Sequence, residues 1–118
     1  ANHNNSNSNL TKIIGAQSVA SSFMHAIYYQ GTQDNIIERP SLADGLSGPV
    51  ERNSITIPIV KKLVDQMVLV SEEEIRIAIH YAWNCLGEKI EASAAVALAA
   101  LLGHHIEENP PYVIILSG

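Results

Sequence analysis

The sequence predicts an α/β fold, a small three-layer domain with about three parallel strands and four helices. Three short runs of β-branched and other apolar residues, each of strand length, recur along the chain. Between them lie longer stretches with helical spacing of apolar residues, several of which begin at a serine or an acidic residue and end at a glycine. Strands that alternate with helices are typical of a parallel sheet with right-handed crossovers.

The expected strands cover residues 11–17, 67–70 and 112–116. The third is an unbroken apolar run, the pattern of a central parallel strand covered on both faces. Open α/β sheets bind ligands beyond the carboxyl ends of such strands. Ser117 would therefore lie where a ligand binds, and Glu91 could come near it. A buried helix and strand with no ligand is the alternative interpretation of the same residues.

Helices are expected near residues 19–29, 57–65, 72–86 and 91–102. Ser18 can cap the first helix and Gly31 can end it. The Ser-Glu-Glu-Glu sequence at 71–74 is a capping box for the third helix, an interpretation we prefer to a metal site built from clustered carboxylates. The fourth helix is apolar all round, so it should be buried on every side.

The remaining segments are irregular. Residues 1–10 are rich in asparagine and serine and are expected to be disordered or a loop, which leaves 11–118 as a single α/β domain. Residues 31–53 form a long connection with several turn-forming prolines and glycines. Connections of this length are usually functional or disordered. The alternative is a surface loop whose glycines serve only its turns.

Composition excludes several classes of function. At 118 residues the chain allows one small domain, and its net charge of −5 without a basic cluster argues against nucleic acid as a partner. Cys85 is the single cysteine, so there is no internal disulfide, and a reducing compartment fits. There is no membrane-spanning run and no signal-peptide pattern. We therefore expect a cytoplasmic protein with no membrane partner.

The pair His104-His105 beside two glutamates could suggest a metal, but no metal site is expected, because adjacent loop residues rarely point together.

Four motifs, taken in order, carry a resemblance to a known family. The first is Thr-Lys-Ile-Ile-Gly at 11–15, and the second is Ala-Asp-Gly-Leu at 43–46. The third is a run with Ile-Pro-Ile-Val at 57–60, Leu-Val-Asp at 63–65 and Val-Leu-Val-Ser-Glu-Glu-Glu-Ile at 68–75. The fourth is Ile-Glu-Ala-Ser-Ala-Ala at 90–95, followed later by Val-Ile-Ile-Leu-Ser-Gly at 113–118. Together they resemble the C-terminal part of the large domain of threonine dehydratases and serine racemases. These are pyridoxal-phosphate enzymes of the tryptophan-synthase-β type, also called fold-type II. The resemblance covers nearly the whole chain and implies a partial fold-type-II domain.

The resemblance implies both a chemistry and cofactor-binding residues. The full-length family acts on amino acids: its members remove the hydroxyl of serine or threonine and release ammonia and a 2-oxo acid, or they racemise serine. The cofactor is pyridoxal phosphate, held on a lysine. By resemblance, Ser117 would bind the ring nitrogen of the cofactor and Glu91 would lie beside the ring. Asp44 and Gly45 would belong to a segment on the cofactor side of the domain.

The sequence also departs from the family. Its lysine segment and its glycine-rich phosphate loop have no match here, and Ala92 and Ala94 stand where the family favours glycine. We therefore assign no catalytic residue in this chain and expect that it neither binds the cofactor nor catalyses alone. It is either a fragment or remnant of a threonine/serine ammonia-lyase or a stand-alone non-catalytic module that acts through self-association or partner binding. A chance match by an unrelated domain is a third hypothesis.

The expected incomplete sheet bears on assembly. A truncated sheet exposes unpaired backbone groups and apolar area, and both promote association. We therefore expect a homodimer or a higher self-assembly.

Overall fold

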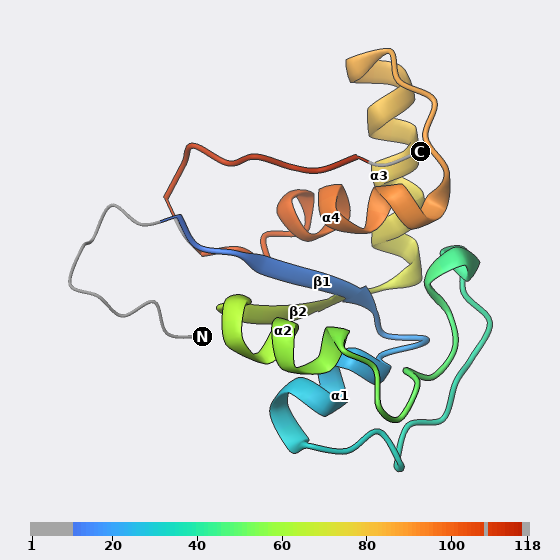
Figure 1. Ribbon diagram of the computed structural model, residues 1–118. Coiled ribbons are helices and arrows are strands. Elements are labelled where there is room, and N and C mark those ends of the chain that lie inside the picture. Colours follow the sequence, from blue (N-terminus) through green and yellow to red (C-terminus); the bar gives the residue numbers. More distant parts are fainter. Residues whose placement is uncertain (1–10, 108, 117–118) are drawn as a thin grey trace.

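The computed structural model describes residues 11–107 and 109–116. Two strands, β1 (Ile14–Ser18) and β2 (Gln66–Val70), pair in parallel, with Ile14 opposite Gln66 and Ser18 opposite Val70. The sheet lies between two helical layers (Figure 1). On one side are α1 (Phe23–Gln30) and α2 (Thr56–Leu63), and on the other are α3 (Glu72–Leu86) and α4 (Ala92–Leu102). The predicted three-layer α/β class with four helices is confirmed.

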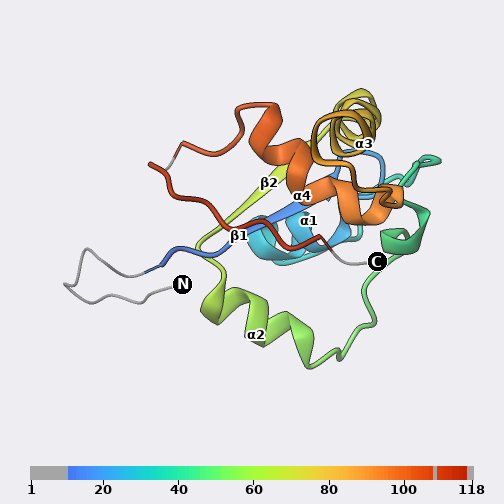
Figure 2. The ribbon, with the colours of Figure 1, turned by 90° about the horizontal axis from the view of Figure 1, so that it is seen from above.

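Helix α4 is the centre of the core. It contacts α3, both strands and a short 3-10 turn, η1 (Asp44–Leu46). Its residues are small, so neighbouring elements can approach closely, and the turn viewed from above in Figure 2 lies against its first residues. The prediction that this helix is buried is confirmed, since six of its eleven residues are buried: Ala94, Ala95, Val96, Leu98, Ala99 and Ala100.

The start of α3 follows from its sequence. The Ser71 hydroxyl accepts a hydrogen bond from the Glu74 amide at 3.1 Å, and the Ser71 amide donates to the Glu74 carboxylate at 2.8 Å. This is the predicted capping box, and the helix has the predicted bounds of 72–86. Behind the cap, Ile75 has no exposed surface. Burial of one such side chain contributes roughly 2–3 kcal/mol to stability. Gly87 ends the helix with a φ of 68°, which favours glycine.

The first helix begins later than predicted. Strand β1 extends to Ser18, and the Val19 amide still donates to the carbonyl of Val70, at 2.9 Å, so the chain is extended where the helix was expected. A turn follows, closed by the Ser21 amide and the carbonyl of Ser18, and α1 begins only at Phe23. Ser18 therefore does not cap α1, because its hydroxyl makes contacts at the end of the sheet instead. Gly31 ends the helix as predicted, with a φ of 81°.

The third predicted strand is absent from the described part of the chain, where the sheet has two strands instead of about three. Residues 112–116 belong to no sheet, and Figure 1 shows this segment on the α4 side, clear of β1. Ile114 and Leu116 pack against the core, whereas Val113 is 91% exposed and Ile115 79% exposed. The segment is therefore covered on one side only. An apolar run alone cannot make a strand, because a strand also needs a neighbouring backbone with which to pair.

Candidate functional site

The candidate site lies where β1 and β2 end, whereas the sequence predicted a site beyond residues 112–116, which form no strand in the described sheet. Ser18 and Val70 are paired at the carboxyl ends of β1 and β2, and the chain passes from β2 through Ser71 straight into α3. Glu72, the first residue of α3, therefore lies beside the end of β1. We call this region the carboxyl edge. It is the position at which open α/β sheets bind ligands.

The Glu72 carboxylate is the centre of the polar contacts at this edge. It accepts a hydrogen bond from the Ser18 hydroxyl, which belongs to a buried residue at the end of β1. It also accepts from the Ser41 hydroxyl at 2.7 Å and from the Leu42 amide at 2.6 Å. Three segments that are far apart in the sequence thus meet on one carboxylate.

The surroundings of Glu72 favour its charged form. Partial burial is the largest single influence and by itself raises the pKa of this carboxyl group. The hydrogen bonds from Ser18, Leu42 and Ser41, together with the positive charge of Arg39, outweigh burial and leave the pKa of Glu72 below its ordinary value. Glu72 is therefore an anion at neutral pH.

A second carboxylate holds the same loop further along. Glu38 accepts from the Ser21 hydroxyl at 2.8 Å and from the Gly48 amide at 2.7 Å, and the Arg39 amide donates to the carbonyl of Ala20 at 2.8 Å. The long connection between α1 and α2 is thus fixed to the carboxyl edge over residues 38–48, which we call the anchored loop. It encloses a shallow depression of about 380 Å³, lined by Glu38, Arg39, Pro40, Ser41, Asp44 and Ser47.

The predicted site residues Asp44 and Gly45 form η1, within the anchored loop. The turn packs on the first turn of α4, where Gly45 lies so close to Ser93 that a Cβ atom would be 2.8 Å from the serine Oγ. Ser93 is two residues after Glu91, the N-cap residue of α4. Glu91 is exposed, and its side chain makes no capping hydrogen bond. The structure therefore brings Asp44, Gly45 and Glu91 into one region, whereas Ser117 lies outside the described residues.

Comparison with known proteins identifies the family of the chain. The family model described as "Pyridoxal-phosphate dependent enzyme" matches residues 1–118. The chain belongs to this family. It is 34% identical over 107 residues to L-threonine ammonia-lyase of Thermotoga maritima, a match that covers 91% of this chain and 26% of the relative. It is 38% identical over 88 residues to serine racemase of Mus musculus, which covers 71% of this chain and 25% of that protein.

Solved structures of the same family superpose on the fold. Serine racemase from Dictyostelium discoideum matches with a TM-score of 0.68 and 32% identity, over 80% of this chain and 29% of that one. Serine racemase from maize matches with a TM-score of 0.65 and 30% identity, over 77% of this chain and 28% of that one. The chain spans about a quarter of the length of the curated relatives it matches.

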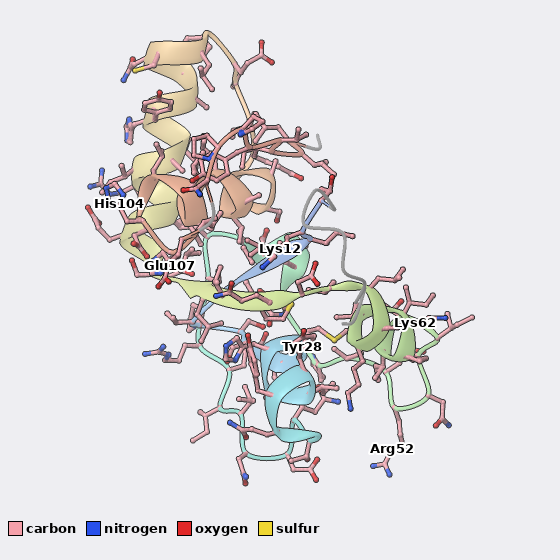
Figure 3. The ribbon with its side chains drawn as sticks, turned by 90° about the vertical axis from the view of Figure 1, so that its left-hand side faces the viewer. Lys12, Tyr28, Arg52, Lys62, His104 and Glu107 are labelled. Atoms are coloured by element: carbon pink, nitrogen blue, oxygen red, sulfur yellow. The ribbon has the colours of Figure 1, made fainter. Side chains whose placement is uncertain are left out.

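The family uses pyridoxal phosphate, which is carried on a lysine. The positions of the four lysines therefore show whether the described residues could form a complete cofactor site. Lys12 precedes β1, and Lys61 and Lys62 lie in the last turn of α2, which leads to the start of β2. These three are at the amino ends of the strands, the edge that Figure 3 turns toward the viewer with Lys12 and Lys62 labelled. The fourth lysine, Lys89, lies between α3 and α4, two residues before Glu91, and it is exposed. The described residues therefore fit one wall of a cofactor site and not a complete one.

The histidine pair follows the end of α4, and its two side chains have different surroundings. His104 has a φ of 61° and is exposed, whereas His105 turns inward and its Nε2 lies 2.9 Å from the Glu74 carboxylate. Figure 3 labels His104 and Glu107 near this end of the helix. Among residues 11–107 and 109–116, no three metal-binding side chains form a cluster. In the same part of the chain, no helix is long and apolar enough to cross a membrane.

The role of Glu72 has no signal in the local sequence. Helix capping accounts in full for the Ser-Glu-Glu-Glu motif, and Ser71 and Glu74 do form that cap. The partners of Glu72, however, lie 54 and 31 residues away, at Ser18 and Ser41. A local pattern carries no information about contacts at that separation.

Proposed function

We propose that this chain is part of a pyridoxal-phosphate-dependent threonine/serine ammonia-lyase, similar to threonine dehydratase, and that it supplies one wall of the cofactor site. The observation that carries the proposal is the packing of Gly45 on Ser93. It places two motif segments, well separated in the sequence, side by side at the carboxyl edge. That edge is where a sheet of this class binds its ligand.

Within this proposal the residues have distinct roles. By the family resemblance, Glu91 would lie beside the cofactor ring, Asp44 and Gly45 would line the same wall, and Ser117, which lies outside the described residues, would bind the ring nitrogen. Pyridoxal phosphate, when bound, acts as an electron sink for the bonds at the α-carbon of an amino acid. What this chain contributes is the shape and charge of the surface against the ring. The exposed carboxylate of Glu91 supplies a negative charge there.

The chain alone is proposed to be inactive. The reaction needs a lysine that carries the cofactor and a loop of backbone amides that holds its phosphate. Three of the four lysines lie at the opposite edge of the sheet. The fourth, Lys89, is exposed between α3 and α4. The lysine and the phosphate loop would come from the part of a complete enzyme that the chain does not match.

A chimera tests the proposal. The matching residues of Thermotoga maritima L-threonine ammonia-lyase are replaced by this chain, and formation of 2-oxo acid from threonine is measured. We expect activity, and we expect Glu91→Gln to reduce it while Glu88→Gln, a change at an exposed glutamate just past the far end of α3, does not. A second chimera with Ala92→Gly and Ala94→Gly restores the family glycines. If both chimeras fold, bind the cofactor and stay inactive, the proposal is wrong.

A second candidate function is that of a non-catalytic module that acts by self-association. The observation in its favour is the exposed apolar surface of α3, where Trp83 is 59% exposed and Ile77 and Leu86 are each 48% exposed. Exposed apolar side chains favour association, because pairing removes them from water. Under either function we propose a cytoplasmic location, on the basis of the single cysteine Cys85.

A further inference from the structure

The anchored loop is held by hydrogen bonds more than by apolar burial. Leu42 is 49% exposed and Leu46 is 47% exposed, and only Ala43 among the apolar residues of 41–46 is buried. Burial of a single alanine side chain contributes little, because little apolar area leaves the water. The position of Asp44 and Gly45 must therefore depend on the polar contacts on either side of them.

Glu72 makes those contacts immediately before the turn. Its Oε1 accepts from the Leu42 amide, and its Oε2 accepts from the hydroxyls of both Ser41 and Ser18. Both serine hydroxyls accept in turn from backbone amides, that of Ala20 at 3.0 Å and that of Ala43 at 3.0 Å. Hydrogen bonds to a charged acceptor are about twice as strong as neutral ones. One charge thus orders both the end of β1 and the start of η1.

We infer that Glu72 is a positioning residue for the cofactor wall: its carboxylate charge holds Asp44 and Gly45 against the first turn of α4. The functional meaning of this role rests on the proposed function, since Glu72 itself is taken to touch no cofactor. The role belongs to the anion and not to the bulk of the side chain. A glutamine of the same size has one acceptor oxygen, so it cannot accept from both the serine hydroxyls at Oε2 and the Leu42 amide at Oε1, and without the charge each bond that remains is weaker.

The neighbouring glutamates provide matched controls. Glu73 is exposed and pairs with Arg76 on its own helix, one residue from Glu72 and with the same charge in the same first turn. Glu38 anchors the far end of the loop through Ser21 and Gly48. The charged groups around Glu72 are Arg39, Glu38 and Asp44, which share the depression beside it, and Glu74, which faces His105.

The experiment uses the full chain, labelled with ¹⁵N, and follows three amides by NMR. The Leu42 amide reports the bond to Glu72, the Leu46 amide reports η1 through its bond to the carbonyl of Ala43, and Ser93 reports the contact with α4. In Glu72→Gln we expect hydrogen exchange at Leu42 and Leu46 to accelerate by about tenfold or more. The Ser93 resonance should shift, while exchange at the buried Val70 stays unchanged. Glu73→Gln should alter none of these signals.

The dependence on pH separates positioning from mere folding. In the wild type the Leu42, Leu46 and Ser93 resonances should move together, with one midpoint, as acid protonates Glu72. Glu38→Gln should leave that midpoint in place, and Glu72→Gln should abolish it. If Glu72→Gln does not fold, the common midpoint in the wild type still tests the inference.

The inference that Glu72 positions the loop would be overturned by an unchanged Leu42 signal in folded Glu72→Gln, or by a common pH midpoint that persists in this variant. Both readouts are independent of the activity of the chimera, so failure of the inference and failure of the proposed function are distinguishable.

Discussion

A Cβ atom on Gly45 would lie 2.8 Å from the Oγ of Ser93 and 3.6 Å from its Cβ. The glycine is required for space and not for an unusual backbone, since the positive φ values among the described glycines occur at Gly31, Gly48 and Gly87. The anchored loop and the first turn of α4 therefore touch at a point where no larger residue fits without movement. This contact sets the distance between the Asp44 segment and Glu91.

The contact predicts that a loss of stability caused at Gly45 can be recovered by a second change at Ser93. Gly45→Ala should lower the free energy of unfolding by about 1–2 kcal/mol, because the added methyl group overpacks against Ser93. Ser93→Ala removes the crowded oxygen and should have a small effect alone. The double variant should recover most of the lost stability. Urea denaturation of the four proteins forms a double-mutant cycle that measures this coupling. Equal destabilisation of the single and double variants would show that Ser93 is not the obstacle.

Acid stability should depend on Glu74. Partial burial is the largest influence and by itself raises the pKa of Glu74, but the hydrogen bond from the Ser71 amide and the contacts with His105 outweigh it and leave the pKa below its ordinary value. A carboxyl group with a lowered pKa in the folded state contributes stability that is fully present above its unfolded pKa. That contribution is lost as the pH falls through the folded pKa.

We therefore expect Glu74→Gln to destabilise the chain at pH 7, and we expect the effect to shrink in acid as the pH falls through the lowered folded-state pKa of Glu74. Thermal unfolding of both proteins from pH 7 into acid measures the difference. Glu73→Gln is the control, because Glu73 lies in the same first turn and is exposed. A constant difference between wild type and Glu74→Gln at all pH values would contradict the argument.

Local patterns predicted what is held locally. The bounds of α3 were predicted to the residue, because its ends depend on neighbouring residues: Ser71 and Glu74 cap the start, and Gly87 ends the helix. The start of α1 was missed, because the Ser18 hydroxyl binds Glu72 and the next amide extends the sheet. The strand at 112–116 was wrong for a related reason. Its apolar run shows burial on one side, but no pattern within it names a partner strand.

Some features of the candidate site could be predicted from the sequence, and others could not because they depend on contacts between distant residues. That Asp44 and Gly45 lie in one region with Glu91 was implied by the family resemblance, which assigned all three residues to the cofactor side of the domain. The contacts of Glu72 could not be predicted, since they join residues 31 and 54 positions apart. Whether Ser117 joins the site is a prediction that stays untested, because that residue lies outside the described part of the chain.

The isolated chain should not deaminate threonine or serine when pyridoxal phosphate is supplied. It should also show no visible absorbance band of a lysine-bound cofactor, because Lys12, Lys61 and Lys62 lie at the amino ends of the strands, away from Glu91. Spectra and an assay for 2-oxo acid test both statements. If a band appears and Lys89→Ala removes it, the lysine that precedes Glu91 serves the site and our assignment of the site is wrong.

The last prediction concerns assembly and follows from the exposed surface of α3. Figure 1 shows the C-terminal half of this helix rising clear of α4. Trp83 and Leu86 lie on that half, at 59% and 48% exposure, and Ile77 lies nearer the sheet at 48%. The segment at 112–116 adds Val113 and Ile115, which are largely exposed. Helix α4 is largely buried, so of these two apolar helices α3 is the one that offers exposed apolar side chains.

We expect a homodimer or a larger assembly at micromolar concentration, because pairing two copies of such a surface removes apolar area from water and a two-fold dimer is the commonest way to do so. Light scattering measures the mass. Trp83→Asp and Leu86→Asp should shift the chain toward the monomer, whereas Asn35→Asp adds the same charge at an exposed residue outside α3 and should not. A wild-type chain that is strictly monomeric, with Trp83 fluorescence unchanged on dilution, would show that this surface does not drive self-association.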